Sequence, residues 1–172
     1  MNETKSWEDI CPDTYRTINK AILPQSQYNK TIEWEYNSNG LFLFGPKGTK
    51  KRCCAYSLLA KLYSQGFDMI GTTATELVHQ AGRKKYYCTI DDWATEYINA
   101  PVLFISGLGD EPQQDRGSNE VYHIIKRRAE ELFPLIITSD YDLDEILRRM
   151  PDTTRGSALV RRLREFCTPI AF

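Results

Sequence analysis

Short apolar runs alternate with helical patterns along most of this chain, and a glycine-rich turn joins the first such pair. Leu41 to Phe44 form a continuous apolar run, which is typical of a strand buried on both faces. Further runs predict strands at 67–70, 102–105, 135–138 and 168–172. Helical spacing of apolar residues separates these runs and predicts helices at 55–62, 75–80, 90–99, 121–132, 143–150 and 159–166. This alternation favours an α/β fold with a five-stranded, mostly parallel sheet.

Three loops of the predicted sheet follow strands directly. They lie at 45–52, 106–111 and 138–141. In open parallel sheets, ligands bind at the carboxyl ends of the strands. We therefore expect these three loops to converge on one site.

Length and composition limit the classes of protein that remain. The 172 residues suffice for one domain with a sizeable core. A net charge of −1 provides no global attraction to DNA or membranes, so nucleic-acid binding would need a local basic patch. No apolar run approaches the roughly 20 residues that span a bilayer. Five cysteines without a CxxC spacing predict reduced thiols and a cytoplasmic location, and two scattered histidines predict no metal site.

The turn after the first strand carries the pattern of a phosphate-binding loop. It reads Gly45, Pro46, Lys47, Gly48, Thr49, Lys50, Lys51 and Arg52, beside the P-loop pattern GxxxxGK[ST]. In such a loop, backbone N–H groups at a helix N-terminus surround a phosphate. We expect these eight residues to bind ATP or ADP; the alternative is a chance glycine-rich turn. Two positions depart from the pattern, because Lys50 replaces a glycine and Arg52 replaces the hydroxyl that holds Mg²⁺.

The ordered set of motifs resembles the DnaC/IstB-like AAA+ ATPases of the helicase-loader type. GLFLFGPKGTKKRCCAYSLLAKL looks like their Walker A strand and helix, and APVLFISGLGDE looks like their Walker B strand. PLIITSD resembles their sensor strand, RGSALVRRLREFCTPIAF their last helix and final strand, and SWEDICPDTYR their first segment. The resemblance implies a P-loop NTPase AAA+ three-layer core at 41–172, a segment at 1–40 that packs on this core, and no helical lid.

The residues that hydrolyse ATP in this family are largely replaced here. Ser106 and Gly107 stand where two Walker B acids are expected, and Asp140 replaces the sensor asparagine. Asp110 and Glu111 could substitute for the lost acids, but we expect them to lie about one turn too far along the loop. The resemblance therefore implies degenerate Walker A and Walker B motifs, ATP or ADP bound without a well-held Mg²⁺, and hydrolysis that is weak or lost.

The resemblance implies a functional role for each of two groups of basic residues, and for each group the alternative is a solvated surface without such a role. Arg162, Arg161 and Arg155 match the region of an arginine finger that acts on a neighbour's nucleotide; the alternative is a solvated helix face. A second group could bind single-stranded DNA through phosphate attraction and base stacking, or form a solvated loop; it consists of Arg83, Lys84, Lys85 and Tyr86. We expect 126–128 to form an exposed helix face and Cys53 and Cys54 to have packing roles.

The function implied by the resemblance is that of a DnaC-like accessory protein in DNA replication, or of a phage or mobile element. The implied partners are a replicative helicase or another AAA+ protein, while single-stranded DNA and self-association stay open and no membrane is involved. Residues 7–22 and the sheet edge would hold adenine, which predicts weak affinity. The alternative is a non-enzymatic AAA+-derived module that pairs with an active ATPase, a helicase or another copy of itself.

Overall fold

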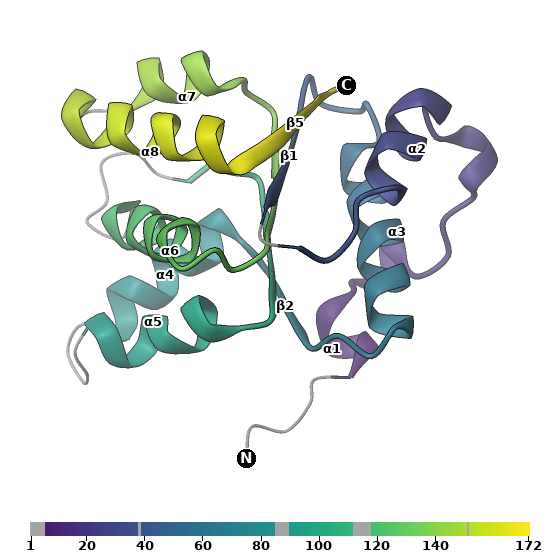
Figure 1. The fold of residues 1–172 in the computed structure, drawn as a ribbon, viewed down its shortest axis with the longest axis horizontal. Coiled ribbons are helices and arrows are strands. Elements are labelled where there is room, and N and C mark those ends of the chain that lie inside the picture. Colours follow the sequence, from purple (N-terminus) through teal and green to yellow (C-terminus); the bar gives the residue numbers. More distant parts are fainter. Residues whose placement is uncertain (1–5, 38, 85–89, 112–117, 151) are drawn as a thin grey trace.

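Five parallel strands form the central sheet of the protein (Figure 1). The computed structural model describes residues 6–37, 39–84, 90–111, 118–150 and 152–172. The strands are β1 (Gly40–Phe44), β2 (Met69–Thr73), β3 (Val102–Ser106), β4 (Leu135–Ser139) and β5 (Cys167–Ala171). Their order across the sheet is β2-β3-β4-β1-β5. The prediction of a five-stranded parallel sheet is therefore confirmed.

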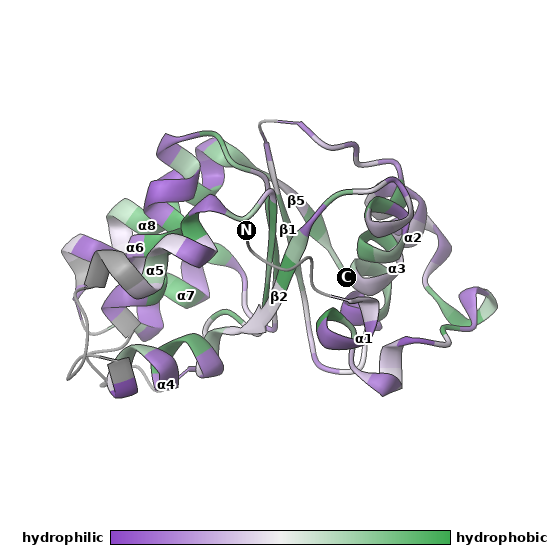
Figure 2. Cartoon of the chain, turned by 90° about the horizontal axis from the view of Figure 1, so that it is seen from below, coloured by the Kyte–Doolittle hydropathy of each residue, from purple (hydrophilic) through white to green (hydrophobic). Residues whose placement is uncertain are grey.

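Helices cover both faces of the sheet, so the protein has three layers (Figure 2). One layer holds α1 (Trp7–Ile10), α2 (Gln25–Ile32) and α3 (Lys51–Ser64), together with two 3-10 turns at Asp13–Tyr15 and Lys20–Ile22. The other layer holds α4 (Ala74–Lys84), α5 (Ile90–Asn99), α6 (Ser118–Glu130), α7 (Leu143–Arg149) and α8 (Thr153–Phe166). In Figure 2, hydrophobic strands run between these two layers.

The alternation of side chains along β1 explains why the sheet has two apolar faces. Leu41 and Leu43 are buried in a cluster with the α3 residues Leu58, Leu59 and Leu62. Phe42 points the opposite way and is buried among residues of α4 to α8. Each such side chain contributes about 1.5 to 3 kcal/mol when it leaves water. This two-sided burial is what the continuous apolar run predicts.

The N-terminal segment packs on the α3 side of the sheet. Ile10, Cys11, Leu23 and Trp34 are buried in the same apolar cluster as β1 and α3. A capping box starts α1, since the Ser6 side chain accepts from the backbone N–H of Asp9 and the Asp9 carboxylate accepts from that of Ser6. Tyr15 of the first 3-10 turn stacks on Tyr56 of α3, with ring centroids 4.6 Å apart, so this segment packs against α3.

The predicted bounds of two elements, the second strand and the helix at 121–132, differ from those in the structure. The strand expected at 67–70 begins only at Met69 and extends to Thr73. The Phe67 ring stacks on Tyr36, with ring centroids 4.3 Å apart, and its backbone N–H closes the end of α3 on the carbonyl of Leu62. The helix expected at 121–132 ends at Glu130, because Leu132 has a left-handed φ of 57°.

The expectation of an exposed helix face at 126–128 is wrong for Arg128, which is completely buried. Its Nη1 atom donates to the carbonyls of Tyr97, Ile98 and Ala100, each at 2.8 Å, and Nη2 donates to Pro134. Burial lowers the pKa of this guanidinium to about 10, so it stays charged at neutral pH. Arg128 thus satisfies carbonyls at the end of α5, whose dipole also favours a cation there.

Leu132 occupies a position that glycine usually takes. The backbone N–H of Phe133 donates to the carbonyl of Arg128, as in the Schellman motif that closes a helix, and Leu132 is the left-handed residue of that motif. We expect Leu132→Gly to raise the free energy of unfolding by about 0.5 to 1 kcal/mol in urea denaturation, because it removes the left-handed strain. The Leu132 side chain is 57% exposed, so its loss costs little burial. Leu132→Ala keeps a Cβ atom, and an equal gain in that control would show that the backbone is not the cause.

Candidate phosphate-binding site

The loop between β1 and α3 keeps the backbone shape of a phosphate-binding loop. Three of its residues have positive φ angles: 146° at Gly45, 85° at Gly48 and 67° at Lys50. Lys50 is the residue that precedes α3, and it adopts the left-handed conformation although its side chain makes this unfavourable by about 1 kcal/mol or more. The surrounding fold therefore imposes the glycine conformation on a lysine.

Lys51 lies at the first turn of α3 and is only 5% exposed. Its Nζ atom donates to the carbonyls of Gly45 at 2.7 Å and Pro46 at 3.0 Å. The same atom lies 2.6 Å from a carboxylate oxygen of Asp140. The ammonium is thus held inside the loop, with a carboxylate as its charged partner.

Asp140 reaches the loop because β4 lies beside β1 in the sheet. Phe44 of β1 pairs with Ser139 of β4, so the residues that follow the two strands are neighbours. Asp140 also lies 3.7 Å from the Nζ atom of Lys47, and its side chain is 13% exposed. A negative charge therefore occupies the strand end where the family resemblance implies a neutral amide.

Arg52 of α3 and Asp110 of the loop after β3 form a second pair of opposite charges in the site. Their side chains approach to 3.9 Å. A Cβ atom added to Gly107 would lie 3.0 Å from the Asp110 carboxylate and 3.4 Å from the Arg52 guanidinium. The Arg52 guanidinium is thus close to the Walker B strand, on the side where the motif would present its acids.

The expectation that Asp110 and Glu111 lie too far away is wrong for Asp110. Gly107 and Gly109 have φ angles of 74° and 93°, and the backbone N–H of Asp110 donates to the carbonyl of Gly107 at 3.0 Å. This tight turn brings the Asp110 carboxylate into the cavity beside the P-loop. Glu111 differs, because it is 3% exposed and its carboxylate accepts from the backbone N–H of Gly109 at 2.7 Å and the hydroxyl of Tyr122 at 3.1 Å.

Ser106 and Gly107 offer no ligand to the cavity. Ser106 is 4% exposed, and its Oγ atom accepts from the Thr138 hydroxyl at 3.3 Å. Gly107 has no side chain, and its positive φ disfavours any other residue there. Mg²⁺ prefers carboxylate, hydroxyl and water oxygens, but both carboxylates of the cavity face cations and Arg52 replaces the hydroxyl. The described residues therefore do not fit a Mg²⁺ site.

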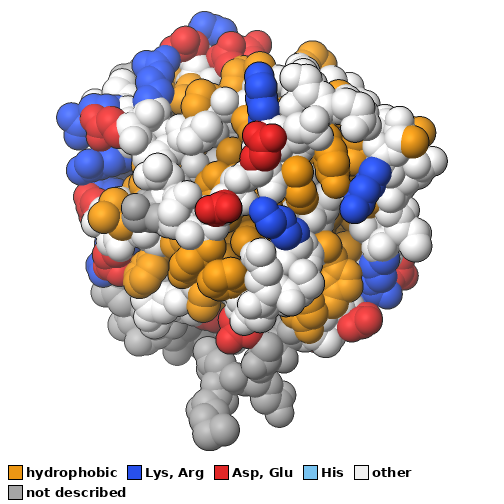
Figure 3. Space-filling model, turned by 45° about the vertical axis from the view of Figure 1, so that its right-hand side comes forward, with side chains coloured by type: hydrophobic (Ala, Val, Ile, Leu, Met, Phe, Trp, Pro, Cys, Tyr) orange, Lys and Arg blue, Asp and Glu red, His pale blue; other side chains and the backbone are white. Residues whose placement is uncertain are grey.

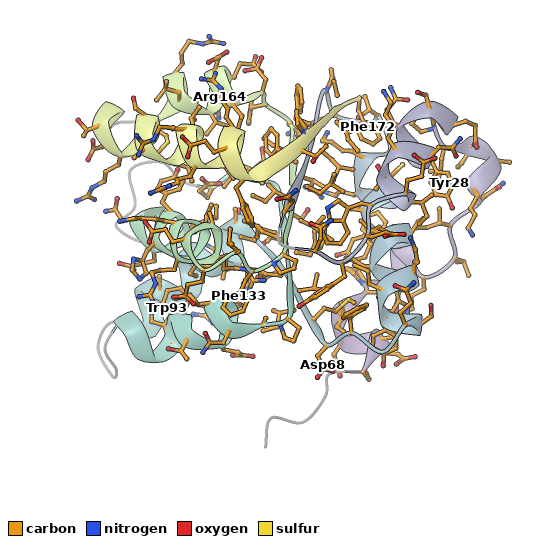
Figure 4. The ribbon with its side chains drawn as sticks, viewed as in Figure 1. Tyr28, Asp68, Trp93, Phe133, Arg164 and Phe172 are labelled. Atoms are coloured by element: carbon orange, nitrogen blue, oxygen red, sulfur yellow. The ribbon has the colours of Figure 1, made fainter. Side chains whose placement is uncertain are left out.

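A cavity of about 580 Å³ lies over the P-loop. Its lining combines the N-terminal segment with the loop and consists of Thr14, Tyr15, Thr17, Ile18, Asn19, Ile22, Leu23, residues 47–53, Asp110 and Asp140. A second hollow of about 510 Å³ shares Gly48 and Lys50 with it and is also lined by Phe172. Figure 4 labels Phe172 at the end of β5, beside α2.

This cavity has a charged floor and a partly apolar wall. Lys47, Lys50, Lys51 and Arg52 face two carboxylates, which leaves an excess of positive charge. Ile18, Ile22 and Leu23 contribute apolar surface from the other side. Figure 3 brings the α2–α3 side forward and shows apolar side chains exposed among single charged groups. Ile22, which is 60% exposed, is one of the large apolar residues in contact with solvent. A ligand with an anionic part and a flat apolar part suits these surfaces.

The three arginines considered as finger residues lie elsewhere, at or near a groove of about 810 Å³ between α6 and α8. Arg155 pairs with Asp152 at 3.2 Å, Arg161 with Glu165 at 3.9 Å, and Arg162 with Glu130 at 3.5 Å. None of the three lines the cavity beside the P-loop. Any action on a nucleotide would therefore be on that of a neighbouring molecule.

Of the basic group at 83–86, Arg83 and the backbone of Lys84 belong to α4. Arg83 is exposed. Lys85 and Tyr86 lie outside the described residues, and so does the side chain of Lys84. Cys53 and Cys54 follow the P-loop in α3. Burial raises the pKa of the Cys54 thiol to about 12, which agrees with a packing role and not with a reactive thiolate.

Solved structures of replication proteins share this fold. The chain is similar to the structure of DnaI, with 19% identity over 86% of this chain and 81% of that one and a TM-score of 0.71. It is similar to the DnaC helicase loader, with 20% identity over 96% of this chain and 97% of that one and a TM-score of 0.70. AMPPCP-bound DnaA from Aquifex aeolicus matches with 16% identity over 86% of this chain and 44% of that one, at a TM-score of 0.69.

These similarities show a P-loop NTPase-like α/β fold of the AAA+ kind. None of the curated proteins compared with the chain matches it. The sequence model of the IstB-like ATP binding proteins matches residues 13–171, which include the whole sheet, the P-loop and the cavity lining described above. The protein therefore belongs to the family of IstB-like ATP binding proteins.

Proposed function

We propose that this protein is a DnaC-like accessory ATPase homologue that binds ATP or ADP without Mg²⁺ and hydrolyses ATP slowly or not at all. The observation that carries the proposal is the retained P-loop, with Lys51 inside it and positive φ angles at Gly45, Gly48 and Lys50. Arg52 and Lys50 supply positive charge where the family would use a metal ion. Backbone N–H groups at the start of α3 add further donors for a phosphate.

Weak or absent hydrolysis follows from the missing metal and water ligands. Phosphoryl transfer depends on positioned water and on charge stabilisation, which Mg²⁺ usually supplies. Ser106 and Gly107 present no carboxylate, and Asp110 is paired with Arg52. In this proposal the nucleotide is a regulatory ligand, which stabilises one state of the protein by binding to it.

The proposed context is DNA replication or a mobile element, with a replicative helicase or another AAA+ protein as partner. Support comes from the family and from the similarity to the DnaC helicase loader. Arg155, Arg161 and Arg162 at the α6–α8 groove would face such a partner or a second copy. Single-stranded DNA is proposed to contact the basic residues at 83–86, of which the structure describes Arg83 as exposed. No helix among the described residues is long and apolar enough to cross a membrane.

One observation favours a second candidate function, a non-enzymatic interaction module. Lys51 already has three partners, namely two loop carbonyls and the Asp140 carboxylate. If these contacts outcompete a phosphate, the P-loop serves only as a structural turn. The protein would then act through its surfaces alone.

Calorimetric titration with ATP and ADP, in EDTA and in Mg²⁺, distinguishes the two functions. We expect binding with a dissociation constant between about 1 μM and 1 mM that persists in EDTA. Lys51→Ala should weaken it at least about tenfold, since a hydrogen bond to a charged group contributes roughly 1.5 to 3 kcal/mol and Asp140 would lose its partner. Lys126→Ala, an exposed lysine on α6, should leave binding unchanged. No heat at millimolar nucleotide would reject nucleotide binding and favour the interaction module.

A further inference from the structure

We propose that the site selects a nucleoside diphosphate over the corresponding triphosphate, because the Asp140 carboxylate occupies the place of the terminal phosphate. This inference rests on the proposed nucleotide binding and names the ligand of that same site. In a P-loop, the lysine at the start of the helix reaches the β- and γ-phosphates. Here that lysine is Lys51, and its Nζ atom lies 2.6 Å from the carboxylate of Asp140. A protein carboxylate thus stands where the last phosphate of ATP would meet its lysine.

Hydrogen bonds of the residues before and after Asp140 fix the position of its backbone. Before it, the Ser139 hydroxyl donates to the carbonyl of Leu108 at 2.6 Å, and the Ser139 carbonyl accepts from the backbone N–H of Gly45 at 3.2 Å. After it, the backbone N–H of Tyr141 donates to the Ser139 hydroxyl at 3.0 Å. A capping box between Asp142 and Glu145 then starts α7. These contacts fix the backbone on both sides of Asp140, and the ion pair with Lys51 holds its carboxylate towards the loop, so a γ-phosphate that took this place would break that pair.

The distribution of charge in the cavity separates a region that is already neutralised from one that can accept an anion. Asp140 pairs with Lys51 and lies 3.7 Å from Lys47, so both lysines have a carboxylate nearby. Lys50 is exposed and lines the cavity next to the start of α3. The helix N-terminus beside it favours an anion through its N–H groups and its dipole. The α- and β-phosphates of a diphosphate can therefore bind near Lys50, while a third phosphate would approach Asp140.

Repulsion between like charges gives the direction and size of the selectivity. Two negative charges a few ångströms apart in a partly buried site interact strongly. No Mg²⁺ would screen them, because the described residues do not fit a metal ion there. We expect ADP to bind at least about tenfold more tightly than ATP, even though ATP carries more charge for the surrounding cations.

The test is calorimetric titration of ADP and ATP in EDTA into the wild-type protein and two variants. The wild-type ratio tests the inference without any substitution, and an ADP preference of at least about tenfold supports it. Asp140→Asn keeps the shape of the side chain but removes the charge, and it should reduce the preference to near unity. Asp144→Asn removes the same charge from an exposed position on α7, where it pairs with Arg164 outside the cavity, and it should retain the preference. Thermal unfolding by circular dichroism verifies that both variants fold.

Three results would contradict the inference in distinguishable ways. Equal affinity of the wild-type protein for ADP and ATP would reject the selectivity while leaving the proposed nucleotide binding intact. A preference for ADP that persists in Asp140→Asn would show that another group is responsible. Absence of binding by either nucleotide would reject the proposed function together with this inference.

Discussion

Arg128→Met is expected to lower the free energy of unfolding by about 3 kcal/mol or more. The substitution keeps an unbranched side chain but removes a donor that serves four carbonyls, those of Tyr97, Ile98, Ala100 and Pro134. Each buried carbonyl left without a donor costs roughly 1 to 3 kcal/mol, and water can restore only part of this. The end of α5 and the start of β4 should then separate more easily from α6. Urea denaturation followed by circular dichroism measures the change.

Arg127→Met is the matched control on the same helix. The Arg127 side chain is 44% exposed and pairs with Glu131 one turn later. Exposed pairs at this spacing contribute about 0.3 to 0.5 kcal/mol, so the control should change stability by less than about 0.5 kcal/mol. If Arg128→Met costs no more than Arg127→Met, then the carbonyls at the end of α5 are satisfied by other donors and Arg128 does not hold these elements together.

Gly45→Ala is expected to lower the free energy of unfolding by about 3 kcal/mol and to weaken nucleotide binding. A Cβ atom at this position would lie 2.4 Å from the carbonyl oxygen of Phe172, far inside contact distance. The φ of 146° is also in a region that side chains rarely adopt. Overpacking and backbone strain each cost roughly 1 to 3 kcal/mol. The chain must shift either β5 or the carbonyl of Gly45, which accepts from Lys51.

Gly48→Ala separates the two causes. Gly48 has a φ of 85°, but a Cβ atom there would meet nothing within 4 Å. Only the left-handed strain of about 1 kcal/mol should appear, and β5 should stay in place. Chemical denaturation measures both variants, and calorimetric titration with ADP compares their binding. Equal losses in the two variants would mean that the contact between Gly45 and Phe172 contributes nothing.

The charged side chains around Lys51 suit the proposed binding of a nucleotide without Mg²⁺. Arg52 stands near the end of β3, where an acid and a hydroxyl would otherwise hold Mg²⁺, and it pairs with Asp110. Asp140 pairs with Lys51 at the end of β4. Each of the two carboxylates therefore has a cationic partner inside the protein. In the proposed function, a nucleotide enters a site whose charges are already balanced by side chains.

Local patterns in the sequence were enough to predict the α/β class, the five strands and the place of the phosphate loop. Continuous apolar runs such as Leu41 to Phe44 predict strands that are buried on both faces. Such a run can be recognised from adjacent residues alone. The loop residues Gly45 and Gly48 adopt positive φ angles, which glycine tolerates because it has no Cβ atom. The boundaries of β2 and α6 were missed, because a stacked Tyr36–Phe67 pair and a left-handed Leu132 decide them.

Only the tertiary structure decided where the charged side chains lie and which groups they contact. Arg128 belongs to a basic run that resembles a solvated face, but the carbonyls that bind it come from residues 97–100, about thirty positions away. Asp110 reaches the P-loop because two positive φ angles reverse its loop, and Asp140 meets Lys51 because β4 lies beside β1. The sequence by itself determined which segments form the sheet and the loop, since the order of apolar, polar and glycine residues within a segment is a local property. Ion-pair partners depend on strand order and loop dihedrals, which no local pattern contains.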